Sequence, residues 1–353
     1  MRDTLLSKER EKMLDTLLSA PAPNHNFIVV LNQFIIVKPK VSIIILNWNG
    51  MAYLEECLKS VFDLEYKNFE VILVDNASTD CSVDLVKEKF PQVKIIVNEE
   101  NFGFAKGNNI GIKSAGGEYI VLLNNDTKVD KKWLSELVRV ADENENVGMC
   151  ASKMLFYAQP DTINSTGMQI WISGGTSDRG FGKKDIGQFD SLEDVIGPCA
   201  GAALYKKNML DYIGFFDEDY FMYFEDTDLA LRGLFQGWKC KFVPSAIVYH
   251  KYQASAKKVK NEVVYYYMVR NSWYNVFKFF PCGTLPLTIM YKLVGDIFYI
   301  FYHKEKYNMK TYGKALYDAF VCLPRLIKER KKIYRRKKIK DFEFIRWLFK
   351  KRM

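Results

Sequence analysis

From Val41 onward, short runs of Val, Ile and Leu alternate with longer segments in which apolar residues recur at helical spacing. The apolar runs predict strands at residues 41–46, 69–75, 93–98 and 118–124. The segments that follow them predict helices at residues 52–62, 79–90, 105–114 and 131–143. Continuous apolar strands separated by helices are typical of a parallel sheet that is covered on both faces. We therefore expect an α/β fold with a mainly parallel sheet flanked by helices.

Polar residues follow three of the predicted strands at the points where the strands end. They are Asn47-Trp48-Asn49-Gly50, Asp75-Asn76-Ala77-Ser78 and Asn124-Asn125-Asp126. Sheets of this type bind ligands at the carboxyl ends of their strands, so one interpretation is a ligand site at this edge. The other interpretation is three ordinary turns, because Asn, Asp, Ser and Gly all favour turns and helix caps.

The sequence lacks the glycine-rich patterns that usually hold phosphate on such sheets. The tetrapeptide NWNG stands where a dinucleotide-binding sheet would carry G-x-G-x-x-G, and no P-loop pattern occurs. If this edge binds a nucleotide, it must hold the phosphates with other groups.

An acidic cluster follows an aromatic segment in YFMYFEDTDLAL, residues 220–231. Glu225, Asp226 and Asp228 precede a helix pattern, and acids in a first helical turn cap free amides and complement the helix dipole. Capping accounts for one or two of these acids, whereas a catalytic role is the alternative for the cluster. The preceding residues 155–200 are rich in Gly, Ser, Thr and Asp, which predicts loops and short antiparallel strands.

The charge of the chain is concentrated near its C-terminus. The 353 residues carry a formal net charge of +9, and the segment from Arg325 onward has 14 Lys and Arg against 3 acids. That segment therefore carries +11 and the rest −2, so the body is not charged as a nucleic-acid binder and no nucleic-acid partner is expected. Seven cysteines without a Cys-x-x-Cys pair argue against a disulfide framework or a structural zinc site and favour a reducing compartment.

Two C-terminal features predict contact with a membrane surface. Residues 283–304 are apolar but are interrupted by Lys292 and Asp296, which favours an amphipathic interfacial helix over a spanning helix. The basic tail mixes Lys and Arg with Phe, Trp and Ile, a composition that binds anionic lipid. A solvated helical tail and an RNA-binding end are the alternatives. No secretory signal is visible, so we expect a cytoplasmic protein that is peripheral on the inner face of the cell membrane.

Five motifs occur in a fixed order: VSIIILNWNG, VILVDNASTD, NFGFAKGNNIGI, YIVLLNND and YFEDTDLALRG. Together they resemble inverting family 2 glycosyltransferases of the GT-A fold, and in particular the rhamnosyltransferase-like branch. The resemblance implies a glycosyltransferase domain at residues 41–280, with a nucleotide-binding half at 41–150 and an acceptor half at 151–280. Residues 1–40 would be an N-terminal extension, and residues 281–353 an amphipathic and basic helical region that associates with membranes.

The resemblance implies a set of residues that bind the nucleotide-sugar donor. They are Asn47, Trp48, Asn49, Asp75, Ser78, Lys106, Asn108, Asn124 and Asn125. Asp75 would accept a hydrogen bond from a uracil or thymine ring, and Trp48 would stack on that ring. Asn108 departs from the family pattern, because many members carry at this position an arginine that contacts the diphosphate.

The resemblance also implies a divalent metal, Mn²⁺ or Mg²⁺, on the donor diphosphate. The segment Asn124-Asn125-Asp126 stands in the place of the family's Asp-x-Asp, so Asp126 would be a metal ligand. His250 follows the acidic cluster at the family's spacing and would complete the metal shell, although an exposed histidine at a strand end is the alternative. Asn124 is a second departure, because an amide replaces the first acid of the motif.

By the same resemblance, Asp226 would be the catalytic base. An inverting transfer is a single in-line displacement, which needs one base near the acceptor hydroxyl and a metal to neutralise the leaving diphosphate. Glu225 and Asp228 would orient the acceptor or the base, and the neighbouring aromatic residues would line the acceptor site.

The implied reaction moves a sugar from dTDP-rhamnose or a UDP-sugar to a glycan or lipid-linked glycan in cell-surface polysaccharide synthesis. Two alternatives belong to other classes. One is a sugar-phosphate nucleotidyltransferase, which would need a glycine-rich loop with Arg and Lys where NWNG stands. The other is a non-catalytic protein that binds nucleotide sugars.

Overall fold

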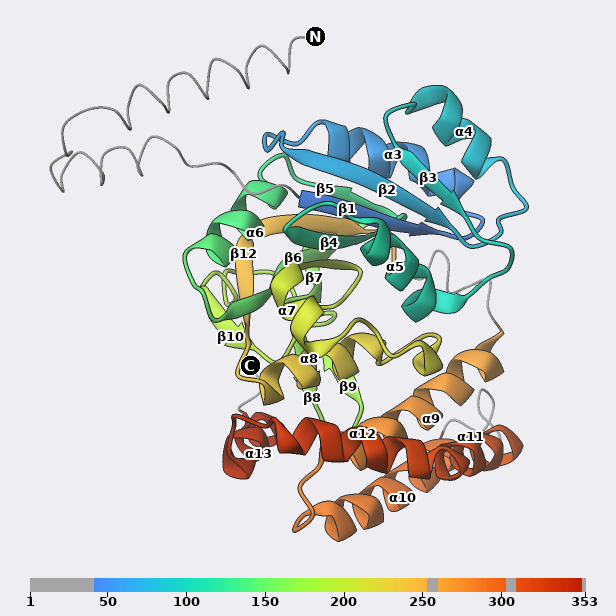
Figure 1. The fold of residues 1–353 in the computed structure, drawn as a ribbon, viewed down its shortest axis with the longest axis vertical. Helices are drawn as coiled ribbons and strands as arrows, with labels where there is room; N and C mark the ends of the chain where they lie inside the picture. Colours follow the sequence, from blue (N-terminus) through green and yellow to red (C-terminus); the bar gives the residue numbers. More distant parts are fainter. Residues whose placement is uncertain (1–40, 253–259, 303–308, 351–353) are drawn as a thin grey trace, which may run out of the picture. The chain divides into compact units, whose positions relative to one another are not determined.

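The computed structural model describes residues 41–252, 260–302 and 309–350 (Figure 1). Contacts within the chain divide it between Lys38 and Pro39, and the described residues all belong to the unit that begins at Pro39. The N-terminal extension expected at residues 1–40 lies outside the described residues.

The described strands form one large mixed sheet and one small two-stranded sheet. Their bounds are β1 Val41–Asn47, β2 Phe69–Asp75, β3 Lys94–Val97, β4 Tyr119–Asn124, β5 Thr127–Val129, β6 Val147–Phe156, β7 Gln159–Ser165, β8 Met168–Ile170, β9 Thr176–Asp178, β10 Glu193–Val195, β11 Ala202–Lys206 and β12 Lys239–His250. The large sheet runs β10-β12-β6-β11-β4-β1-β2-β3, with β5 paired to β12 and β7 paired to β6, and β8 pairs with β9 in the small sheet. The predicted strands β1 to β4 pair in parallel, whereas β11 is antiparallel to both β4 and β6.

Helices separate the first strands and gather again after β12. Their bounds are α3 Met51–Phe62, α4 Ser82–Lys89, α5 Gly103–Ser114, α6 Trp133–Asp142, α7 Lys207–Ile213, α8 Glu225–Phe235, α9 Asn261–Phe279, α10 Leu285–Tyr302, α11 Met309–Val321, α12 Leu323–Arg335 and α13 Asp341–Phe349, with a short 3₁₀ helix η1 at Glu218–Tyr220. The four helices predicted between the first strands are therefore present as α3 to α6, with ends shifted by a few residues.

The large sheet is buried on both faces because successive side chains of a strand point to opposite sides. On β1, Ile43 and Ile45 pack into one apolar cluster and Ile44 packs into the other, and all three are fully buried. Helices α3, α4 and α6 contribute to the first cluster, and α5 contributes Ala105 and Ile112 to the second. This two-sided burial explains why the strands are continuous apolar runs.

The parallel register places the polar strand ends side by side. Asn47 is the direct neighbour of Asp75, and Leu46 is the neighbour of Asn124. The Asn76 amide donates to the Asn47 carbonyl at 2.8 Å, so the two chains stay together beyond the strands. The three polar segments thus share one edge of the sheet, as the pattern predicted.

The C-terminal helices pack onto the rest of the described unit. Helix α9 contacts α8, α10, α11 and α12, and Figure 1 shows α9 and α12 beside α8. On α13, Phe344 is fully buried, with its ring 5.3 Å from that of Phe235 and 5.4 Å from that of Phe280. The segment that begins at Arg325 therefore contributes apolar side chains to the core.

Helix α10 is amphipathic, as predicted. Its Lys292 is 2% exposed, pairs with Asp296 at 3.1 Å and lies 5.1 Å from the ring centroid of Trp273. The exposed side is apolar and includes Leu287, Met290, Tyr291, Val294, Phe298 and Phe301. Within the described ranges, α10 is the helix whose length and composition would allow it to cross a membrane, and 17% of that stretch is buried.

Candidate active site

The loops after β1 and β2 are held together by Asn47, Asp75 and Ser78. Asn47 Nδ2 donates to Asp75 Oδ1 at 2.8 Å and to Ser78 Oγ at 3.1 Å. Ser78 donates to both Asp75 oxygens, through Oγ at 2.6 Å and through its amide at 2.9 Å. Asp75 is 1% exposed, and because its carboxylate accepts these hydrogen bonds from both loops, it orders this edge of the sheet. A carboxylate has about four lone-pair sites, so these three bonds leave one for a ligand.

The loop that carries Trp48 is fixed to the loop after β2. Asn49 has a φ of 53°, a left-handed conformation that asparagine tolerates. Its Oδ1 accepts from the Thr79 amide at 2.7 Å, and its own amide donates to Ser78 Oγ at 2.8 Å. Trp48 itself is partly exposed, so an aromatic face stands at the rim of an ordered loop.

The Asn-Asn-Asp segment after β4 joins the same edge. Asn125 Nδ2 donates to Asn47 Oδ1 at 2.8 Å. The antiparallel pairing of β5 with β12 sets Thr127 opposite His250, which brings the preceding Asp126 next to the histidine. Asp126 Oδ1 lies 3.2 Å from His250 Nε2, and the two side chains are both largely buried. The structure therefore brings together two predicted metal ligands that are far apart in the sequence.

The pair formed by Asp126 and His250 has the chemistry of a metal site. His250 Nδ1 lies 2.8 Å from Asn164 Oδ1, an oxygen that only accepts, so Nδ1 donates there, and the other ring nitrogen, Nε2, faces Asp126. In the part of the chain that the structure describes, no group of three or more His, Cys, Asp or Glu side chains is placed to hold a metal ion. Two protein ligands fit Mg²⁺ or Mn²⁺ when phosphate oxygens and water supply the rest of the shell.

The loop that leads into α8 is strained. Phe221, Tyr223 and Phe224 have φ values of 60°, 66° and 66°. A non-glycine residue in this left-handed region costs on the order of 1–3 kcal/mol, and such strain persists only where surrounding contacts enforce it. Asp226 is in the first turn of α8 directly after these residues, so the strained loop sets its position.

Asn271 of α9 enforces the conformation of this loop. Its Nδ2 lies 2.9 Å from the Tyr220 carbonyl oxygen, 2.9 Å from that of Met222 and 2.8 Å from that of Tyr223. On the other side, a Cβ on Gly103 at the start of α5 would lie 2.5 Å from the Phe221 carbonyl oxygen. The loop is therefore clamped between α9 and the N-terminus of α5.

Asp226 lies in an environment that raises its pKa to about 6. Burial is the main cause, and the negative charge of Asp178 adds to it. Two amides oppose the shift, because Ala200 donates to Oδ2 at 3.3 Å and Thr227 donates to Oδ1 at 2.7 Å. Burial, followed by the charge of Asp226, also raises the pKa of Glu225 well above its ordinary value. A carboxylate with a pKa near 6 is ionised at neutral pH and still basic enough to accept a proton.

Two consecutive residues connect Asp226 to the Asn-Asn-Asp segment. Ala200 donates its amide to Asp226, and the Gly201 carbonyl accepts from the Asn124 amide at 2.8 Å. A Cβ on Gly201 would lie 2.9 Å from Asn124 Nδ2, so a larger residue would push this contact apart. The candidate base and the candidate metal pair are therefore parts of one site.

Residues 42–214, from β1 to the end of α7, match the model of the family described as Glycosyl transferase family 2. The chain belongs to this family. The assignment to a glycosyltransferase decides against the sugar-phosphate nucleotidyltransferase, whereas the rhamnosyltransferase-like branch stays a prediction.

This glycosyltransferase is similar to two curated relatives over most of its length. An uncharacterized glycosyltransferase of Haemophilus influenzae is 24% identical over 311 residues, which cover 81% of this chain and 87% of the relative. The dolichyl N-acetyl-alpha-D-glucosaminyl phosphate 3-beta-D-2,3-diacetamido-2,3-dideoxy-beta-D-glucuronosyltransferase of Methanococcus voltae is 23% identical over 294 residues, or 74% of this chain and 84% of the relative. Six further relatives match over only 15% to 45% of their own lengths.

A solved structure supports the fold of this glycosyltransferase. The mannosyltransferase PcManGT of Pyrobaculum calidifontis, solved with GDP-Man and Mn²⁺, is similar with a TM-score of 0.51 and 16% identity. The match covers 93% of this chain and 92% of that protein. The likeness concerns the fold alone, and it confirms the GT-A fold expected from the sequence.

Asp228 does not have the position expected of a residue that orients an acceptor. It is fully buried, 2.5 Å from Lys278 Nζ and 2.7 Å from Arg232 Nε. The pair with Lys278 joins α8 to α9, and the pair with Arg232 lies within α8, so the expectation of an acceptor contact is corrected. The aromatic segment needs a similar correction at Tyr220, which is fully buried and donates its hydroxyl to Asn275 Oδ1 at 2.7 Å.

Two residues expected near the diphosphate lie on α5. Asn108 is 1% exposed and its Nδ2 donates to the Phe104 carbonyl oxygen at 2.9 Å, so this donor is used inside the helix. Lys106 is partly exposed, with its Nζ 3.4 Å from the centroid of the Phe102 ring. Of the two, Lys106 is the group that can reach a ligand.

The sequence did not reveal several residues that build this site. Asn164 orients His250, Asn271 clamps the strained loop, and Asp178 raises the pKa of Asp226. Asn109 holds the segment before η1, because its Nδ2 donates to the Phe216 carbonyl oxygen and its Oδ1 accepts from the Phe216 amide. Each is a polar residue in an apolar or helical setting, and this contrast was the one sign of a special role in the sequence. The residues that they contact lie far away in sequence, so the contacts themselves could not be predicted.

Proposed function

We propose that this glycosyltransferase transfers a sugar with inversion and uses Asp226 as the base. The observation that carries the proposal is a carboxylate of raised pKa that Ala200 and Gly201 connect to the Asn-Asn-Asp segment. The acceptor oxygen would attack the anomeric carbon while its proton passes to Asp226. The bond from that carbon to the diphosphate oxygen would break in the same step, so the diphosphate leaves with the electron pair.

The donor would be dTDP-rhamnose or a UDP-sugar. Asp75 keeps one lone-pair site free, and the ring N–H of uracil or thymine is a donor that fits it. Trp48 offers a partly exposed face on which the base would stack. Lys106 would contact the diphosphate.

Asp126 and His250 would hold Mg²⁺ or Mn²⁺ on the diphosphate. When bound, the metal would neutralise the charge that develops on the leaving group. The proton of Nδ1 goes to Asn164, which keeps the Nε2 lone pair of His250 available as a ligand. Asn124 supplies an amide where the family pattern has an acid. The protein would therefore offer the metal a single formal negative charge, that of Asp126.

The acceptor would be a glycan or lipid-linked glycan in cell-surface polysaccharide synthesis, used at the inner face of the membrane. The Methanococcus voltae relative is named for a dolichyl-linked sugar phosphate. The exposed apolar side of α10 and the exposed basic residues of α12 suit a peripheral protein bound to anionic lipid.

The base assignment is tested with Asp226→Asn and a matched control, Asp211→Asn, which changes an exposed acid on α7. Turnover would be measured with the UDP- or dTDP-sugar that supports most donor hydrolysis in the presence of manganese or magnesium. Loss of a general base typically costs about a hundred- to ten-thousand-fold, so Asp226→Asn should lose most turnover while calorimetry shows nearly unchanged donor binding. More than half of wild-type turnover in Asp226→Asn would refute the assignment.

The membrane assignment needs substitutions, because removal of α12 and α13 would open the core. Val294→Glu with Phe298→Glu places charge on the exposed apolar side of α10, where these residues are 65% and 71% exposed. Ile186→Glu is the control, since Ile186 is 82% exposed in a loop. The α10 variant should lose sedimentation with anionic vesicles and the control should keep it. Equal sedimentation of both variants would reject the α10 contact.

A further inference from the structure

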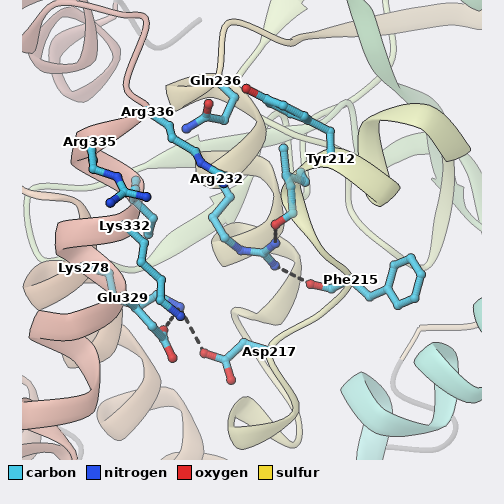
Figure 2. A pocket seen from close by; sticks show the side chains of 12 residues that line it. Tyr212, Phe215, Asp217, Arg232, Gln236, Lys278, Glu329, Lys332, Arg335 and Arg336 are labelled. Carbon is cyan, nitrogen blue, oxygen red and sulfur yellow. Dashed lines mark hydrogen bonds and ion pairs between the residues drawn. The ribbon is translucent and has the colours of Figure 1, made fainter.

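A cavity of about 490 Å³ lies between the C-terminal half of α8 and α12 (Figure 2). Arg232 and Gln236 line it from α8, and Lys332, Arg335 and Arg336 line it at the C-terminal end of α12. This volume lies in the range of roughly 300–1,000 Å³ that is usual for small-molecule sites. The catalytic mechanism uses none of these side chains.

The charges at the floor of the cavity already have partners. Lys278 Nζ lies 3.0 Å from Asp217, 2.5 Å from Asp228 and 2.9 Å from Glu329. Arg232 pairs with Asp228 and donates to the backbone carbonyls at the end of α7. The acids of the floor are therefore neutralised internally, and they leave little negative charge to repel an anion.

The cations on the α12 side are different. Lys332, Arg335 and Arg336 are exposed, and within the described residues none of them has an ion pair or a hydrogen bond from its side chain. Figure 2 shows Arg336 extending from α12 beside Arg232. Three unpaired positive side chains thus gather at one opening, and the two acids that line the cavity, Asp217 and Glu329, are paired with Lys278 and Arg325.

Gln236 gives a second, independent sign of a ligand. It is 7% exposed and lines the cavity, and its Oε1 is buried without a hydrogen-bond partner among the described residues. A buried amide that lacks a partner costs free energy, so a polar group in the cavity would stabilise it. The cavity therefore offers one unsatisfied amide and three unpaired cations.

We propose that this cavity binds a phosphate monoester. Two guanidinium groups and an ammonium group suit a tetrahedral dianion, because guanidinium forks donate in pairs to phosphate oxygens. Gln236 would bond to a hydroxyl group on the carbon side of the ester, and Tyr212, 48% exposed, would cover it from α7. A soluble sugar phosphate or glycerol phosphate has both the phosphate monoester and such a hydroxyl, whereas the headgroup of phosphatidic acid shares only the phosphate monoester.

The proposed site is separate from the donor site but shares α8 with it. Asp226 is in the first turn of α8, whereas Arg232 and Gln236 are at its C-terminal end. The donor diphosphate depends on Asp126, His250 and a metal. Binding in the presence of a chelator therefore reports the α12 cavity and not the donor site.

The test uses the full chain with EDTA and without donor. The variant is Lys332→Gln/Arg335→Gln/Arg336→Gln, and the control variant is Lys328→Gln/Lys331→Gln with Lys310→Gln, which removes the same charge from exposed lysines outside the cavity. One arm titrates glycerol 3-phosphate by calorimetry. The other arm measures sedimentation with phosphatidylcholine vesicles that contain or lack phosphatidic acid. Thermal melts confirm that both variants fold, as expected for exposed side chains without partners.

The cavity variant should bind at least one probe about tenfold more weakly than the control variant, since several charge-assisted hydrogen bonds are lost. Loss for glycerol 3-phosphate identifies a soluble ester as ligand, and loss confined to phosphatidic acid vesicles identifies a lipid headgroup. Gln236→Leu, which keeps all charges, should weaken binding of glycerol 3-phosphate and leave binding to phosphatidic acid vesicles unchanged. Equal weakening in the cavity and control variants, or no binding of either probe by the wild type, would overturn the proposal.

Discussion

Replacement of Asn271 by alanine should destabilise the fold and also impair turnover. Asn271 is fully buried, and its Nδ2 lies within 2.9 Å of three carbonyl oxygens in the loop before Asp226. One net hydrogen bond contributes about 1 kcal/mol, and a buried carbonyl left without a donor costs about 1–3 kcal/mol. Since two amide hydrogens serve three acceptors, we expect Asn271→Ala to lower the free energy of unfolding by about 2–4 kcal/mol.

The effect on turnover follows from the strain in the same loop. Phe221, Tyr223 and Phe224 remain at positive φ only while the clamp enforces it, so the loop should relax once Asn271 is truncated. Asp226 would then move away from its position beside Ala200. A base displaced by about 1 Å can cost on the order of a hundredfold, so kcat should fall more than KM changes.

The assay compares Asn271→Ala with Tyr220→Phe, which removes one buried hydrogen bond to Asn275 and leaves the three carbonyls untouched. Urea unfolding gives the stability loss, and donor hydrolysis at a temperature where both variants are folded gives kcat and KM. Tyr220→Phe should lose about 1 kcal/mol and keep near-normal kcat. The reasoning is refuted if Asn271→Ala loses under about 1 kcal/mol and keeps the kcat of Tyr220→Phe.

Four further predictions concern Asp226, Asn164 and Lys278. Because the base must be unprotonated, kcat/KM should rise as the pH passes about 6, and an Asp226→Asn profile should lack this step. The raised pKa of Asp226 also means that its ionised form costs stability above about pH 6. In urea unfolding at pH 8, Asp226→Asn should therefore be more stable than wild type by at most about 3 kcal/mol. At pH 3 the free energies of unfolding of the two proteins should not differ. Asn164→Ala should weaken manganese-dependent donor binding by about 10- to 100-fold in calorimetry, less than His250→Ala does. Lys278→Met should lower the free energy of unfolding in urea by about 3–5 kcal/mol, because Asp228 would stay buried with Arg232 as its remaining partner.

The part of the fold from β1 to α6 was largely predictable because its order follows from local pattern. Apolar runs marked β1 to β4, and parallel pairing alone then placed Asn47 beside Asp75 and near Asn124. Asp126 and His250 were paired as metal ligands only through the resemblance, and their contact depends on pairing between β5 and β12.

The acidic cluster shows where such prediction ends. Asp226 and Asp228 are two residues apart, yet one joins the catalytic edge and the other pairs with Lys278 on α9. Their different environments come from helices that are distant in sequence, and no local spacing encodes them. The C-terminal tail did carry a usable signal, since Phe344 and Leu348 are four residues apart on one side of α13 and are both buried.

The packing of α13 has a consequence for how the protein is made. Phe235, at the end of the helix that begins with Glu225 and Asp226, packs its ring against Phe344 of α13. A chain emerging from the ribosome therefore cannot complete this part of its core until more than a hundred later residues have been synthesised. Until then α8 presents an apolar side without its partner from α13. The packing of α8 is thus completed only when the α13 segment has been synthesised.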